Sequence, residues 1–223
     1  VVTDGRGSPR ERLYQDYTDD EMRSVRFKEQ KKAAFVGEYA AQIFLDHPSK
    51  AVKDSKDYSV VEDLETILRE TRPQKVFTHN LTDKHDTHVS VALRTIASIH
   101  NLPVELRPVQ LIGCEVWRSL DWLVDSDKYL LNVSDHENLQ NALLGVFDSQ
   151  IVGGKRYDLA SMGLRRANAT YFESHGVDVT TGLSYGMDLT PLITEPNLDP
   201  LEFVGGFIQH LQQDITDRLN RLK

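Results

Sequence analysis

The sequence predicts a layered α/β fold, because strand-like and helix-like segments alternate along the chain. Residues 75–78 form a short strand, and a helical pattern of apolar residues follows from Val89 to Ile99. A strand, a polar loop and a helix make a βα unit, whose loop lies at the carboxyl edge of a parallel sheet. The chain has 223 residues and no convincing linker, so one domain covering residues 1–223 is expected.

The other elements follow from periodicity and capping residues. Apolar residues at helical spacing, after three acidic residues that favour a helix N-terminus, predict a helix over about 20–44. A second helix is expected from Ser59, as N-cap, to Arg72, which precedes a proline. The remaining expectations are strands over 104–117 and 128–133, helices over 135–147 and 157–172, a loop over 176–200, and a C-terminal helix capped by Asp199.

Composition limits the classes of function. The net charge of −8, with basic residues interspersed among acids, argues against nucleic-acid binding and favours a small-molecule partner. No apolar run approaches the roughly 20 residues of a spanning helix, so a soluble protein is expected. The single cysteine, Cys114, excludes an internal disulfide and a Cys-rich zinc site, which fits a reducing, cytoplasmic compartment. The sequence leaves the oligomeric state open, and a homo-oligomer is one of the alternatives.

Residues 82–88 read Thr-Asp-Lys-His-Asp-Thr-His and place two histidines and two carboxylates in the loop of the βα unit. If the helix begins near Asp83, His85 and His88 lie on one face of its first turn. The positive end of the helix dipole favours the neutral imidazole, which is the form that binds a metal. Asp83 and Asp86 are placed to cap free backbone amides or to fix the tautomer of an imidazole.

The same stretch also fits an ordinary helix N-terminus. Acidic residues stabilise the first turn of a helix by about 0.3–1 kcal/mol without any catalytic role. The position of the stretch favours a metal site, because parallel α/β sheets bind ligands at their strand-to-helix loops.

Five short stretches carry a family resemblance. They are Thr-Asp-Gly at 3–5, Arg-Phe-Lys-Glu at 26–29, Val-Phe-Thr-His-Asn at 76–80, Asp-Lys-His-Asp-Thr-His at 83–88 and Ser-Gln at 149–150. In this order they resemble the PIG-L/LmbE-like family of zinc-dependent N-acetylglucosamine deacetylases, whose V-T-H-N strand end precedes D-x-H-x-D-H. The resemblance implies a Rossmann-like three-layer α/β/α sandwich with a mostly parallel sheet.

The resemblance also implies roles for individual residues. His88 would be a Zn²⁺ ligand, and His85 would stabilise the tetrahedral oxyanion and protonate the departing amine. Arg26 and Asn80 would bind the sugar substrate. For Arg26, an ion pair with Glu29 one helical turn away is an equally good interpretation.

Two departures from the family pattern bear on the site. The motif A-H-P-D-D-E, which supplies two zinc ligands and the general base, is absent, so we expect the first strand-helix unit to be missing from this sequence. Thr87 stands where the family more often has Asp, with Asp86 in place of Pro, so the carboxylate partner of the catalytic histidine would be Asp86 or Asp83, or would be missing.

A catalytic zinc needs roughly three protein ligands and an open position for water. The sequence offers one convincing ligand, so the other two lie upstream or the metal site has been lost. His79, Asp4 and His47 are the substitutes that strand ends and their loops offer.

These residues leave two functions open. The first is a zinc-dependent hydrolase that removes an N-acetyl or related acyl group from an N-acetylglucosamine-type sugar conjugate. The second is a non-catalytic carbohydrate-binding or oligomerising member of the same fold that has lost its metal site.

Overall fold

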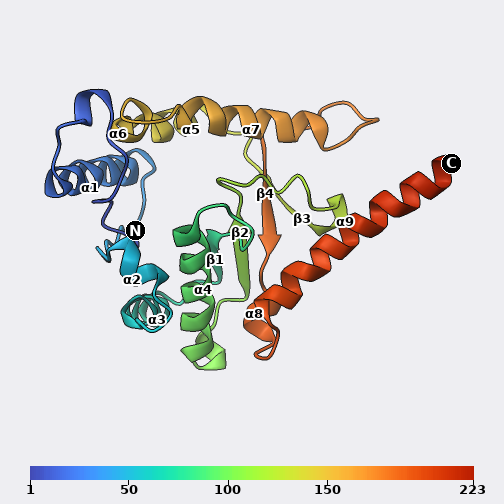
Figure 1. Cartoon of the computed structure of the whole chain (residues 1–223), viewed down its shortest axis with the longest axis horizontal. Coiled ribbons are helices and arrows are strands. Elements are labelled where there is room, and N and C mark those ends of the chain that lie inside the picture. The colour runs from blue at the N-terminus through green and yellow to red at the C-terminus, as the bar shows by residue number, and fades with distance from the viewer. The chain divides into compact units, whose positions relative to one another are not determined.

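The computed structural model describes residues 1–223, whose contacts divide the chain into two compact units. The first unit holds residues 1–54 and 132–183, and the second holds residues 55–131 and 184–223 (Figure 1). Nearly all of the β-sheet and the whole 82–88 stretch belong to the second unit. The single domain expected from the sequence stays a prediction.

A four-stranded sheet has the strand order β1-β2-β4-β3. Its strands are β1 (Lys75–His79), β2 (Gln110–Cys114), β3 (Lys128–Asn132) and β4 (Leu183–Asp188). β1 pairs in parallel with β2, through the crossover helix α4 (Asp86–Asn101) that a parallel pair needs. β2 pairs antiparallel with β4. The mixed α/β class is therefore confirmed, whereas the sheet is not mostly parallel as expected.

The strand β4 lies inside the 176–200 segment, for which the sequence predicts a loop. Glycines and prolines suggest a loop there, but Gly186 serves the packing of a strand. A Cβ atom at Gly186 would lie 2.6 Å from Cγ2 of Ile112, so only glycine allows the two strands to approach this closely. The short helix α8 (Pro191–Thr194) follows in the same segment.

Helices α3 (Ser59–Thr71) and α4 pack against each other, and α4 also lies along β1 (Figure 1). Their apolar faces and the central strands form the core of the second unit. Its fully buried side chains include Val60, Ala92, Ile99, Leu111, Ile112, Tyr185 and Met187. At the carboxyl end of the parallel pair, a Cβ atom at Gly113 would lie 2.8 Å from the Cα atom of Asn80. Glycine here lets β2 and the end of β1 pass closely.

The first unit is mostly helical. Its elements are η1 (Arg12–Tyr14), α1 (Asp19–Val36), α2 (Ser49–Lys53), α5 (Glu137–Gly145), α6 (Asp148–Ile151) and α7 (Tyr157–Tyr171). A capping box of Thr18 and Glu21 begins α1. The helix ends at Val36 instead of continuing to about residue 44, because Gly37 is its C-cap and Glu38 has a left-handed φ of 52°.

Several expected boundaries are confirmed and one strand is shorter than expected. Helices α3, α5 and α7 and strand β3 lie where the sequence predicts them, although the N-cap of α3 is Tyr58 and Ser59 is its first helical residue. The expected strand over 104–117 contains only β2, preceded by the 3₁₀ helix η2 (Val104–Leu106), and η3 (Asp125–Asp127) lies just before β3.

The C-terminal helix α9 (Pro200–Leu222) is confirmed, with its expected cap. The side chain of Asp199 accepts hydrogen bonds from the backbone N–H groups of Leu201 and Glu202 at 2.7 and 3.2 Å. None of the residues of α9 is buried. None of the helices combines the length and the hydropathy that crossing a membrane requires.

Candidate metal centre

The 82–88 stretch lies in the β1–α4 loop, next to the carboxyl end of β1. Helix α4 begins at Asp86 with His85 as its N-cap residue, so the helix starts three residues later than expected. Asn80 shapes the loop, because its side-chain N–H donates to the Cys114 carbonyl at 3.0 Å and its Oδ1 accepts from the Thr82 N–H at 2.9 Å. Asn80 is fully buried. These contacts support a structural role for Asn80, and substrate binding by it stays a prediction.

Asp83 organises the centre of the loop. Its Oδ1 accepts a hydrogen bond from the His85 backbone N–H at 2.9 Å, and its Oδ2 accepts one from the Trp117 backbone N–H at 3.2 Å. The Nδ1 atom of His88 lies 3.4 Å from the same Oδ2. The Asp83 side chain is fully buried, so this carboxylate is held from several sides.

Four aromatic rings stack beside this carboxylate. The rings of His79 and His88 lie 3.8 Å apart at an interplanar angle of 7°. His85 continues the stack at 4.6 Å from His88, and Trp117 follows at 6.4 Å from His85. His85 is exposed, so the outer part of the stack faces solvent while His79 and His88 are half-buried.

The local electrostatics favours neutral imidazoles next to an ionised carboxylate. Burial, together with His88, lowers the pKa of His79 to about 4. Burial also lowers the pKa of His88, although Asp83 opposes the shift. Burial alone would raise the pKa of Asp83, but the N–H groups of His85 and Trp117 and the nearby His88 outweigh it, and the pKa is lowered.

One donor atom each from His79, Asp83 and His88 forms a group in which all atoms lie within 4.8 Å of one another. Imidazole nitrogen and carboxylate oxygen are ligands that Zn²⁺ accepts. A metal lies in the plane of an imidazole that binds it, so the parallel rings of His79 and His88 do not converge on one ion as they stand. His88 fits a ligand best, because Asp83 faces its Nδ1 and leaves Nε2 free for a metal.

The remaining predicted residue of the loop, Asp86, is the first residue of α4 and is exposed. It lies where a carboxylate favours the helix dipole. Of the two carboxylates in this loop, Asp83 contacts a histidine ring. Neither arrangement tests the predicted catalytic roles of the two residues.

Arg26 belongs to the first unit. Its Nε atom is buried without a hydrogen-bond partner, and burial lowers the pKa of its guanidinium. Glu29 instead accepts hydrogen bonds from the backbone N–H and the hydroxyl of Ser149, at 2.6 and 2.8 Å. Two separate stretches of the family resemblance, around residues 26–29 and 149–150, therefore meet in one place. A sugar-binding role for Arg26 stays a prediction.

Asp4 and His47 also lie in the first unit, at the parallel bridge between Thr3 and His47. The side chain of Asp4 is paired with Arg6 at 2.9 Å. Of the three proposed substitute ligands, only His79 is brought next to His88 by the contacts of the second unit.

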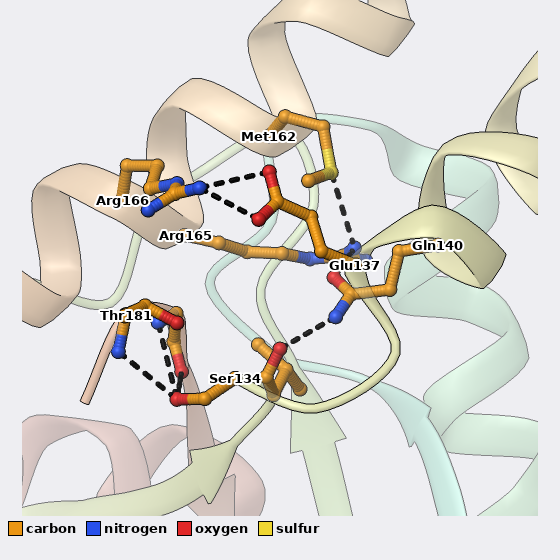
Figure 2. A pocket seen from close by; sticks show the side chains of 9 residues that line it. Ser134, Glu137, Gln140, Met162, Arg165, Arg166 and Thr181 are labelled. Carbon is orange, nitrogen blue, oxygen red and sulfur yellow. Dashed lines mark hydrogen bonds and ion pairs between the residues drawn. The ribbon is translucent and has the colours of Figure 1, made fainter.

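A hollow in the first unit lies among α5, α7 and the segment around Thr181 (Figure 2). Its polar groups are bound to one another: Glu137 pairs with Arg166 at 2.7 Å, and Arg165 donates to Gln140 at 2.6 Å. Ser134 accepts from the backbone N–H of Thr181 at 3.0 Å. These internal contacts favour a structural junction over a ligand site.

The sequence does not indicate Trp117 as part of the centre. Its backbone holds Asp83 and its ring extends the stack, although it lies far along the chain from the 82–88 stretch. The feature that could have indicated Trp117 is its position just after β2, because neighbouring parallel strands end at the same edge of the sheet.

The fold and this site define an α/β protein with a histidine and carboxylate cluster at a strand-to-helix loop. Residues 1–99 match the family model described as PIG-L, GlcNAc-PI de-N-acetylase. The resemblance to the PIG-L/LmbE-like family is thereby confirmed over these residues. A comparison with curated proteins gives no match.

Solved structures share the fold at low sequence identity. One is N,N'-diacetylchitobiose deacetylase from Pyrococcus horikoshii, with a TM-score of 0.55 and 17% identity over 82% of this chain and 70% of that chain. A conserved protein from Thermus thermophilus has a TM-score of 0.60 and 18% identity, over 89% and 83% of the two chains. The 4-carboxy-2-hydroxymuconate hydratase from Pseudomonas putida has a TM-score of 0.60 and 17% identity, over 84% and 80%.

Proposed function

We propose that this chain forms part of a zinc-dependent hydrolase that removes an N-acetyl or related acyl group from an N-acetylglucosamine-type sugar. The match of residues 1–99 indicates a deacetylase at the level of the family. The observation that carries the proposal is the buried Asp83 carboxylate facing Nδ1 of His88, which leaves Nε2 to bind a metal. Fold alone does not decide the reaction, because one of the similar structures is a hydratase.

The residues of the β1–α4 loop would have different roles in the reaction. His88 would hold the metal through Nε2, and Asp83 would fix its tautomer and orientation. A bound zinc ion lowers the pKa of a coordinated water towards about 7 and polarises the acyl oxygen. His85 is exposed next to His88, where its ring would donate a hydrogen bond to the oxyanion and a proton to the departing amine. Asp86 is the second candidate for the carboxylate partner of His85.

The other ligands and the general base would come from a segment like the A-H-P-D-D-E strand of the family. β1 supports this idea, because it is the end strand of the sheet and its other edge is free to pair. Phe77 in this strand is 52% exposed. A strand added beside β1 would extend the parallel part of the sheet towards the three-layer arrangement that the resemblance implies.

The proposed substrate is a small amino-sugar conjugate, with Arg26 and Asn80 as the candidate binding residues. The Nε atom of Arg26 is buried without a hydrogen-bond partner, which supports a role of Arg26 in substrate binding. The same role is supported less strongly for Asn80, because its side chain already forms hydrogen bonds with Cys114 and Thr82. A cytoplasmic location belongs to the same proposal and rests on the single cysteine.

The proposal is tested by acetate release from N-acetylglucosamine conjugates with the full-length protein. The change His85→Ala should lower kcat by about 100-fold or more while the zinc content stays the same. Undiminished turnover in this variant would contradict the role of His85. A full-length protein that binds sugar but neither binds zinc nor releases acetate would support the non-catalytic alternative.

A further inference from the structure

We propose that Glu115 is a positioning residue of the β1–α4 loop, which acts on Asp83 through the backbone of Trp117. Glu115 is the first residue of the β2–η3 loop, residues 115–124, and follows the carboxyl end of β2 directly. It is buried, at 8% exposure. A buried carboxylate has to be surrounded by hydrogen-bond donors, so its donors show which segments it holds together.

Three donors meet the Glu115 carboxylate. Its Oε1 accepts from the Tyr185 backbone N–H at 2.9 Å and from the Ser184 hydroxyl at 3.3 Å, and both of these residues belong to β4. Its Oε2 accepts from the Leu120 backbone N–H at 3.0 Å, five residues further along the same loop. The side chain therefore fixes the β2–η3 loop to β4 with one oxygen and closes the loop on itself with the other. A carboxylate has two acceptor oxygens for this purpose, whereas an amide has only one.

The contact with Tyr185 also ends the pairing of β2 with β4. In an antiparallel ladder, the two residues of a hydrogen-bonded pair exchange both backbone hydrogen bonds. The Glu115 N–H donates to the Tyr185 carbonyl at 3.3 Å, but the Tyr185 N–H donates to the Glu115 side chain. The main chain after Glu115 is thereby released from the sheet.

The released segment binds the β1–α4 loop through two adjacent residues. The Trp117 N–H donates at 3.2 Å to Oδ2 of Asp83, the oxygen that also faces Nδ1 of His88. The Nε atom of Arg118 donates to the Thr82 carbonyl at 2.5 Å. The β2–η3 loop therefore holds the carboxylate that orients His88.

Glu115 fixes both ends of the turn that presents the Trp117 N–H. The turn begins at Glu115 itself and ends at Leu120, which is fully buried and bonded to the same carboxylate. Glu115 acts through Trp117 and Asp83, so its role is positioning. The consequence for zinc rests on the function proposed above: a less firmly held Asp83 orients His88 less well and lowers its affinity for a metal.

Hydrogen exchange of the Trp117 amide in the metal-free full-length protein tests the proposal. In Glu115→Gln an NH₂ group replaces one oxygen and faces a backbone N–H, so the Trp117 amide should exchange about tenfold faster relative to the Ile99 amide. Ile99 is fully buried in α4 and reports the opening of the whole unit. Glu105→Gln, which removes an exposed carboxylate in η2, is the matched control and should leave this ratio unchanged. An unchanged ratio in Glu115→Gln would overturn the proposal.

A second variant covers the case in which Glu115→Gln does not fold. Glu115→Asp keeps the charge, but its side chain is one methylene shorter and cannot reach both β4 and Leu120. The exchange ratio of Trp117 to Ile99 should therefore rise in this variant too. A wild-type ratio in Glu115→Asp would likewise count against the proposal.

Zinc affinity, measured by competition with a chelator, separates positioning from a general loss of stability. Glu115→Gln should lower the affinity by about tenfold in the wild-type background. Because the effect passes through Asp83, the same change should cause no further loss in Asp83→Asn. Two losses that multiply would reject the route through Asp83. A wild-type protein that binds no zinc would contradict the proposed function alone, since the exchange ratio is measured without metal.

Discussion

Replacing Asp83 with asparagine perturbs the centre of the β1–α4 loop with almost no change in volume. Asparagine still offers one carbonyl oxygen, which can accept from the His85 N–H. Its amide group then faces the Trp117 N–H, so donor meets donor in a place where the wild-type side chain is fully buried, and Nδ1 of His88 no longer faces a carboxylate. The change therefore removes acceptors from groups that have no water to replace them.

The expected cost follows from these contacts. A hydrogen bond to a charged group contributes about 1.5–3 kcal/mol, and leaving a buried donor without a partner costs about 1–3 kcal/mol. These two effects overlap at one oxygen of Asp83, so Asp83→Asn should lower the free energy of unfolding by about 2–4 kcal/mol. The His88 ring also loses its orienting carboxylate, and zinc affinity of the full-length protein should fall by about 10–100-fold.

Urea denaturation and zinc titration of the two proteins measure these effects. The control is Asp86→Asn, three residues away on the exposed first turn of α4, which should change both quantities much less. If Asp83→Asn is as stable as Asp86→Asn and binds zinc equally well, the positioning role of Asp83 is refuted.

Three further predictions concern stability. Burial and a neighbouring histidine lower the pKa of His79 from 6.5 to about 4, so the unfolded chain binds more protons between these values. Without metal, stability should therefore fall by roughly 3 kcal/mol at most as the pH drops from about 6.5 to about 4, and His79→Asn should flatten this dependence in urea titrations at each pH. Gly113→Ala would place Cβ 2.8 Å from the backbone at the end of β1, so thermal unfolding should report a loss of about 1–3 kcal/mol, whereas Gly163→Ala, in open space within α7, should not destabilise. Ser149→Ala removes one of the donors to the buried Glu29 carboxylate and should cost about 1–3 kcal/mol in chemical denaturation; an unchanged midpoint would mean that this contact is replaceable.

The βα unit could be predicted because its signals are local. Apolar residues from Val89 to Ile99 have helical spacing, and residues 75–78 form a short strand before the polar loop. The two roles suggested for Asp83, capping amides and contacting an imidazole, also follow from its distance along the chain to His85 and His88. Sequence separations of two to five residues leave few conformations to consider.

Contacts between distant segments could not be predicted in the same way. Gly186 suggests a loop, because the sequence does not show that Ile112 packs over it. Trp117 has no pattern that links it to Asp83, since their contact depends on the pairing of β1 with β2. The predicted start of α4 is wrong because Asp83 and Asp86 are equally acceptable helix N-terminal residues, and only the turn around Asn80 decides between them.

Zinc affinity of the full-length protein with His88→Ala tests the central claim most directly. The variant should lose the bound metal, whereas His79→Ala should keep it, because only His88 has a free Nε2 oriented by a buried carboxylate. Competition with a chromogenic chelator measures both affinities, and circular dichroism confirms that the variants are folded. Zinc bound by His88→Ala as tightly as by the wild type would contradict the assignment.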